Sequence, residues 1–163
     1  MKKLLLIPFI FATMLISCSK KENSELSEQT KLIVDNISRD SIMFDSSESW
    51  NKYLKLLGNA STEELVDLTT HKKPIVRCFA FDALCVKEYP KIREIFYYHE
   101  NDTIESVAIS SGCIRDRSLV RTYMFIALHP VSSNSKYKFS RKEFDSMYKN
   151  YYKRPAANSR LAQ

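Results

Sequence analysis

The strongest limit on what this chain can fold into is its glycine content, which is two residues in 163. A phosphate-binding loop or a dinucleotide-binding turn needs several glycines close together, whereas Gly58 and Gly112 lie in different parts of the sequence. β-Sandwiches and barrels turn about every 8–12 residues and seldom form with so little glycine, while helical repeats tolerate it. With 44% hydrophobic and 27% charged residues, the composition suits one globular domain. The expected fold class is therefore all-α.

The first eighteen residues have the pattern of an export and lipidation signal. Lys2 and Lys3 precede a run of mainly apolar residues from 4 to 16, which is typical of a secretory signal and too short for a permanent span. The run ends in Leu15-Ile16-Ser17-Cys18, which resembles the lipobox of bacterial lipoproteins. The resemblance implies diacylglycerol transfer to the Cys18 sulfur, cleavage before Cys18 and acylation of its amino group. The alternatives are a plain signal peptide with an incidental cysteine, or an uncleaved anchor.

The lipobox resemblance also predicts where the protein resides and how the chain is divided. Two or three acyl chains make a stable membrane anchor. Ser19 follows the cysteine and Asp is absent there, which by analogy with lipoprotein sorting indicates the outer membrane, facing the periplasm. The expected organisation is a cleaved signal peptide (1–17), a polar tether (18–24), a helical-repeat domain (25–155) and a disordered tail (156–163).

Apolar residues recur at helical spacing through the middle of the chain. Five of them fall on one face of a helix between 74 and 86, where Pro74 suits the first turn. The same spacing returns 28 residues later, from Val76 to Ile104, and 26 residues earlier, at Trp50. The three helices predicted from this pattern bury Trp50, Tyr53, Leu54 and Leu57; Val76, Phe79, Ala80, Ala83 and Leu84; and Ile104, Val107, Ala108, Ser111 and Gly112.

Capping signals predict where these and other helices begin and end. Ser61 with Glu64, and Ser140 with Glu143, have the spacing of capping boxes, and Asp102 with Glu105 has a similar Asp-x-x-Glu spacing. Gly58 is expected to end the helix that contains Trp50. Further helices are expected over 25–43, from Pro90 to His99, over 119–127 and over 140–154, with a loop at 129–137. The run 118–128 is also compatible with a strand.

The segment Lys73-Pro74-Ile75-Val76-Arg77-x-x-Ala80-x-x-Ala83-Leu84 is similar to the Pro-x-Val-Arg-x-x-Ala-x-x-Ala-Leu motif of HEAT repeats. The resemblance implies a short HEAT-like α-solenoid made of stacked helix pairs. The second copy, over 102–113, lacks the arginine and has Gly112 where leucine belongs. The period is also shorter than the roughly 40–47 residues of usual HEAT units. An irregular helical bundle is the alternative architecture.

No linear motif for catalysis, cofactor binding or metal binding is present. The sequence lacks GxSxG, HExxH and paired CxxC spacings. Cys78 and Cys85 lie too far apart on one helix to form a disulfide, so both are expected to be buried thiols. His71 and His99 each follow a predicted helix, where a histidine interacts favourably with the helix dipole. No catalytic residue, metal or cofactor is therefore expected.

The charged residues concentrate near the C-terminus. Residues 136–154 carry seven basic side chains against two acidic ones, with tyrosines between them. Nucleic acid is not a partner for an exported lipoprotein, so anionic lipid or an acidic protein is the expected target. A solvated end helix of the solenoid explains the same charges. The candidate partner-binding residues are Lys149, Tyr151, Tyr152, Lys153 and Arg154. On the helix of Pro74, Arg77 and Asp82 are expected to face solvent or a neighbouring repeat.

These features predict a membrane-anchored, non-enzymatic binding or scaffold lipoprotein of the bacterial envelope. Membrane lipid would be contacted through acylated Cys18, and the helical-repeat surface would hold a protein or polymer partner. The alternative is an envelope enzyme whose site is assembled from residues scattered in the sequence. Three or more titratable groups converging in a closed pocket would favour the enzyme. A groove lined by tyrosine, arginine and lysine would favour binding.

Overall fold

The computed structural model describes residues 25–111 and 114–151. The predicted signal peptide and lipidation site, the tether, Gly112, Cys113 and the predicted tail lie outside the described residues. The described elements, in chain order, are α1 (Glu28–Ile37), β1 (Ile42–Met43), α2 (Ser47–Asn59), α3 (Thr62–Leu68), α4 (Pro74–Val86), α5 (Ile92–Tyr98), β2 (Ser106–Ser111), β3 (Ile114–Leu119), α6 (Val120–Ala127) and α7 (Arg141–Tyr151).

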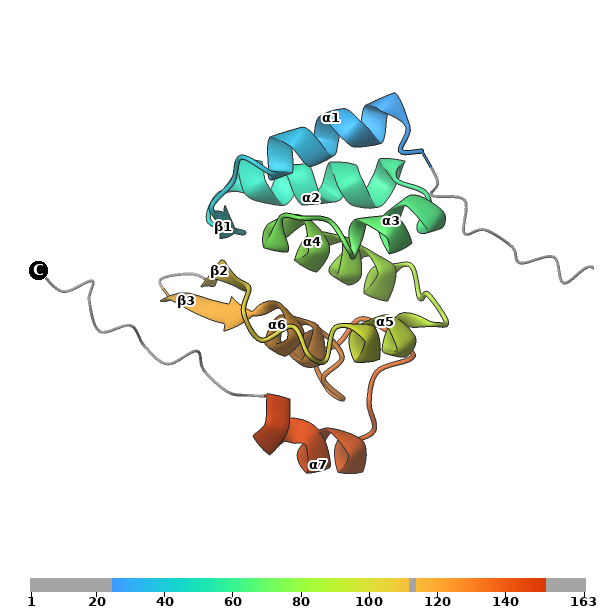
Figure 1. The fold of residues 1–163 in the computed structure, drawn as a ribbon, viewed down its shortest axis with the longest axis vertical. Coiled ribbons are helices and arrows are strands. Elements are labelled where there is room, and N and C mark those ends of the chain that lie inside the picture. The colour runs from blue at the N-terminus through green and yellow to red at the C-terminus, as the bar shows by residue number, and fades with distance from the viewer. Residues whose placement is uncertain (1–24, 112–113, 152–163) are drawn as a thin grey trace, which may run out of the picture.

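The helices stack along the long axis of the molecule, with the strands beside the stack (Figure 1). From one end to the other the layers are α1, α2, α3 with α4, α5 with α6, and α7. The chain is therefore mainly helical, as the glycine content and the apolar periodicity predict. In the part of the chain that the structure describes, no helix is long and apolar enough to cross a membrane.

Helix α4 is the centre of the core. It packs against α2, α3, α6 and β2, and apolar side chains cover nearly its whole circumference, as in a helix buried on all sides. Phe79 and Phe81 are both fully buried on it. Its bounds match the prediction, with Pro74 at the first helical position, where the missing N–H is not needed.

The prediction of a helix over 104–112 is wrong, because residues 106–111 form strand β2. This strand pairs antiparallel with β3 and parallel with the short β1, in the order β1-β2-β3. The apolar residues of this segment fit the two-residue alternation of a strand as well as the spacing of a helical stripe. Val107 is buried, and Ile109, two residues later, packs on the same core. Asp102 and Glu105 do not cap a helix; both carboxylates pair with Arg77 on α4 instead. The fold is accordingly helical with a small sheet, and the all-α class needs that correction.

Two details of the first helices also differ from the prediction. The helix expected over 25–43 ends at Ile37, and strand β1 follows it. Gly58 lies within α2, which runs on to Asn59 because the N–H of Ala60 still bonds to a helical carbonyl, that of Leu56, at 3.0 Å. Helix α2 buries Ser49, Tyr53 and Leu56, so its inward face is turned relative to the predicted stripe. Trp50 and Leu54 are consequently 48% and 44% exposed.

Later predictions are confirmed more closely. Helix α5 buries Ile92 and Phe96, as its spacing predicts. Helix α6 covers most of 119–127, and the strand alternative applies to Ser118 and Leu119, the last two residues of β3. Helix α7 begins after Ser140, whose hydroxyl accepts from the N–H of Glu143 at 3.3 Å, as its capping box predicts.

The capping box that begins α3 also joins it to the start of α1. The N–H of Ser61 donates to one carboxylate oxygen of Glu64 and the N–H of Ser27 donates to the other, both at 2.7 Å. Glu64 is 7% exposed. Burial by itself would raise the pKa of Glu64, but these hydrogen bonds outweigh it and lower the pKa to about 2.

A pH-dependent contribution to stability follows from Glu64. Because its pKa is lower in the folded state, this carboxylate stabilises the fold above the unfolded value near 4.5, and the contribution disappears as pH falls toward 2. We expect Glu64→Gln to be less stable than the parent chain by about 2–3 kcal/mol at pH 7, a difference that vanishes near pH 2. Urea unfolding at several pH values measures it. Glu63→Gln, at the exposed neighbouring position, should leave the pH dependence unchanged, and a constant difference for Glu64→Gln would refute this role.

Candidate binding pocket

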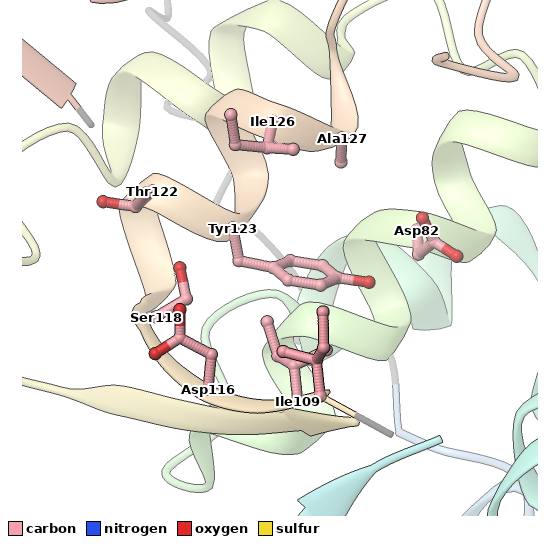
Figure 2. Close-up of a pocket in the computed structure, with 9 residues that line it drawn as sticks. Asp82, Ile109, Asp116, Ser118, Thr122, Tyr123, Ile126 and Ala127 are labelled. Carbon is pink, nitrogen blue, oxygen red and sulfur yellow. The ribbon is translucent and has the colours of Figure 1, made fainter. Parts of the chain in front are cut away.

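A pocket with a volume of about 370 Å³ lies between α4, α6 and the β2–β3 hairpin (Figure 2). Most of its surface is apolar, and it is open to solvent beside Ile114, which is 69% exposed. The lining residues are Asp82 from α4, Ile109 from β2, Ile114, Asp116 and Ser118 from β3, and Thr122, Tyr123, Ile126 and Ala127 from α6.

The hairpin contributes to this pocket because its side chains alternate between two faces. On β3, Ile114, Asp116 and Ser118 line the pocket. The intervening Arg115 and Arg117 point to the opposite face, since successive side chains of a strand alternate. The guanidinium of Arg117 donates to the Ser106 hydroxyl at 3.3 Å, across the strand pair on that opposite face. The basic residues of the hairpin are thus kept out of the pocket.

Asp82 is the polar group on the α4 side of the pocket. Burial raises the pKa of its carboxyl, and a hydrogen bond donated by the Tyr53 hydroxyl partly offsets that effect. Of the two expected environments for Asp82, the solvent-facing one is wrong, because the side chain is half-buried between α2 and the pocket. The bond from Tyr53 on α2 is instead a contact with the neighbouring predicted helix. In the sequence pattern, Asp82 falls opposite the main apolar face of α4, but other elements pack against that side of α4 as well.

Tyr123 extends across the pocket from α6, with its hydroxyl end on the side of Asp82 (Figure 2). Burial, and next the charge of Asp82, raise the pKa of the Tyr123 hydroxyl well above its ordinary value. The phenol therefore stays protonated at neutral pH. Asp116 lies on the other side of the Tyr123 ring in the same view, at an exposed position of β3.

The lining carries two carboxyl groups and no lysine, arginine or histidine. In a chain with a formal charge of +6, this makes the pocket a locally acidic region bounded by apolar walls. Low-dielectric walls focus such a field onto whatever occupies the cavity. The arrangement favours ligands that are partly apolar and partly positively charged.

The pocket brings together no nucleophile and base of a familiar kind. Cys78 and Cys85 are buried as free thiols, and burial raises the pKa of both, which confirms the expectation for them. His99 is the C-cap residue of α5 and is buried, which lowers its pKa and favours the neutral ring. His71 lies beyond the end of α3, and its Nδ1 accepts from the N–H of Lys73. Among the described residues no cluster has the ligands to hold a metal ion.

The C-terminal residues predicted to bind a partner are only partly described. Lys149 is exposed on α7. Tyr151 is half-buried: its hydroxyl donates to the Glu100 carboxylate at 2.9 Å, and its ring packs against Phe96 and Phe125. Tyr152, Lys153 and Arg154 lie outside the described residues. Tyr151 therefore helps to hold α7 onto the stack.

Sequence reasoning missed this pocket, although two signals pointed toward it. One is Asp82, the one carboxylate of a helix whose other residues, apart from Arg77, are apolar. The other is the alternation of Ile114, Asp116 and Ser118 with two arginines, a strand pattern with one basic face. Neither signal predicts which elements pack together, because that depends on how the hairpin packs against α6.

No protein-family model matches this chain, and neither does any curated protein or any solved structure. The geometry of the pocket and the pattern of the sequence are the observations from which a function can be proposed.

Proposed function

We propose that this chain is a membrane-anchored, non-enzymatic binding lipoprotein of the bacterial envelope, whose short HEAT-like helical stack holds a protein or polymer partner. The observation that carries the proposal is the open, largely apolar pocket between α4, α6 and the hairpin. Pockets of this kind, with a few polar groups inside apolar walls, are typical ligand sites. The expected location is the outer membrane, facing the periplasm, with acylated Cys18 in the lipid.

The HEAT-like part of the proposal is supported by the contacts of Arg77, the arginine of the repeat motif. Its guanidinium lies 3.1 Å from the carboxylate of Asp102 and also pairs with Glu105, both in the segment that follows α5. This contact joins α4 to the segment after α5, the place expected for the second copy of the motif, and repeat units likewise contact their neighbours. That segment continues into strand β2 and not into a second repeat helix. The basic α7 end, with exposed Lys149, would face anionic lipid or an acidic partner.

An envelope enzyme is the second candidate, and one observation favours it. Asp82, Asp116 and Tyr123 are three titratable groups on one pocket, and a carboxyl with a raised pKa is suited to donate a proton. Asp82 and Asp116 lie on opposite sides of the Tyr123 ring (Figure 2), and the mouth is open, which favours holding a ligand over sequestering a reaction. A ligand recovered chemically unchanged after long incubation supports binding; a converted one supports the enzyme.

Site-specific photocrosslinking in the native membrane tests the binding proposal. A photoreactive phenylalanine analogue at Ile114, on the rim, should capture a discrete partner, whereas the same analogue at Tyr98, which is 75% exposed outside the pocket, should not. Ala127→Trp fills the pocket and should reduce the adduct at Ile114 by about tenfold or more. Tyr98→Trp is the matched control, because it adds an indole outside the pocket. An adduct that persists with Ala127→Trp, or that forms equally from Tyr98, contradicts a partner seated in this pocket.

A further inference from the structure

The chemistry of the pocket limits which ligand it can stabilise. None of the ion pairs among the described residues involves Asp82 or Asp116. The hydrogen bond to the Asp82 carboxylate comes from a neutral phenol, that of Tyr53. A partly buried carboxylate without a cation is unfavourable, and a positive charge beside it removes that penalty. A positive charge beside Asp82 would therefore be stabilising.

The side chains around Asp82 suit an ammonium group better than a bare metal ion. An ammonium has three N–H donors, and the carboxylate and the Tyr123 hydroxyl both accept hydrogen bonds. Most of the pocket surface is apolar, and Ile109, Ile126 and Ala127 contribute to it; these side chains offer carbon atoms where a hydrated metal ion needs oxygen ligands. The apolar walls instead suit a carbon stem attached to the charged group.

We propose that the pocket binds a primary ammonium carried on an apolar stem, with the ammonium at Asp82 and the stem along Ile109 and Ile126. This inference rests on the proposed binding function and names the ligand chemistry of the same pocket. Asp116, at the exposed side, adds negative potential without contacting the bound nitrogen. Two sources supply this chemistry, the lysine side chain of a partner and a free alkylamine, and both share the same recognition.

Calorimetry with small probes on the whole mature chain tests the proposal at pH 7. Hexylamine should bind about tenfold or more tightly than 1-hexanol, because the charged hydrogen bond to Asp82 is absent with the alcohol. Asp82→Asn should reduce hexylamine affinity to that of hexanol, and Asp116→Asn should reduce it by a smaller factor. Asp35→Asn is the matched control, since Asp35 is exposed on α1 and outside the pocket; it should change nothing.

The outcomes separate this inference from the proposed function. Equal binding of hexylamine and hexanol to the unaltered chain overturns the ammonium proposal without relying on any variant that fails to fold. The ammonium proposal is also overturned if neither probe binds. In either case, a photocrosslinked adduct at Ile114 that Ala127→Trp removes would still support the proposed binding function. A short peptide with one lysine between alanines identifies the source: tighter binding than hexylamine indicates a partner's lysine, and weaker binding indicates a free amine.

Discussion

Phe125→Ala is expected to lower the free energy of unfolding by about 3–5 kcal/mol, the usual range for removing a buried phenylalanine. Phe125 is fully buried on α6. Its ring stacks on that of Phe144 from α7, with centroids 4.3 Å apart, and lies 6.0 Å from that of Phe96 on α5. The rings of Phe139 and Tyr151 also surround it. One side chain thus contacts aromatic residues of α5, of α7 and of the loop before α7, and its loss leaves a cavity that none of them can fill alone.

Chemical denaturation followed by circular dichroism measures this loss. Tyr98→Ala removes an aromatic ring that is 75% exposed, and it should change the stability by less than about 0.5 kcal/mol. Trp50, the one tryptophan of the sequence, lies on α2 at the other end of the stack. If the stack unfolds as one unit, the fluorescence of Trp50 and the circular dichroism should change at the same denaturant concentration in both variants. A loss below about 1 kcal/mol for Phe125→Ala would show that the aromatic cluster is not essential.

Cys18→Ser is expected to abolish membrane association completely. In the proposed lipoprotein the fatty acyl chains are the anchor, since each buried CH₂ contributes about 0.8 kcal/mol and two or three chains are needed for stable attachment. A serine cannot form the thioether that carries the diacylglycerol.

Sedimentation with membranes and incorporation of labelled fatty acid measure the effect of Cys18→Ser. Ser19→Ala leaves the lipobox intact and should still sediment with membranes and carry the label. A Cys18→Ser variant that does both would exclude this cysteine as the lipid attachment site. It would also remove the reason for choosing envelope partners.

The helices that the sequence predicts well are those whose signals are local. Pro74 and the stripe that follows it define α4 within one segment, and Ser61 with Glu64 caps α3 through contacts three residues apart. The failure at 104–112 has the opposite cause. That segment becomes a strand because it pairs in a hairpin with residues 114–119 and, far away in sequence, with Ile42 and Met43. The spacing of apolar residues within 104–112 does not reveal these partners. Intrinsic preference is a weak guide where such pairing decides.

The pocket could not be predicted for the same reason. Asp82, Ile109 and Tyr123 come from three elements, and their proximity depends on the hairpin folding against α4 and α6. The sequence does show the residue types: a carboxylate in a mainly apolar helix, and a strand with one basic face and one face of acidic and apolar residues. The sequence does not show that these residues line one pocket, because side-chain spacing along one element carries no information about the element packed against it.

The two-residue strand β1 has a consequence for the order in which the molecule folds. It pairs Ile42 with Ala108 and Met43 with Ile109, so the first part of the chain finds its final partner only after β2 is in place. Helical stacks usually assemble quickly from neighbouring contacts, but a pairing across so long a loop must overcome a larger loss of chain entropy. We therefore expect β1 to join the sheet after the β2–β3 hairpin has formed, and a protease cut between α5 and β2 would place β1 and β2 on different fragments.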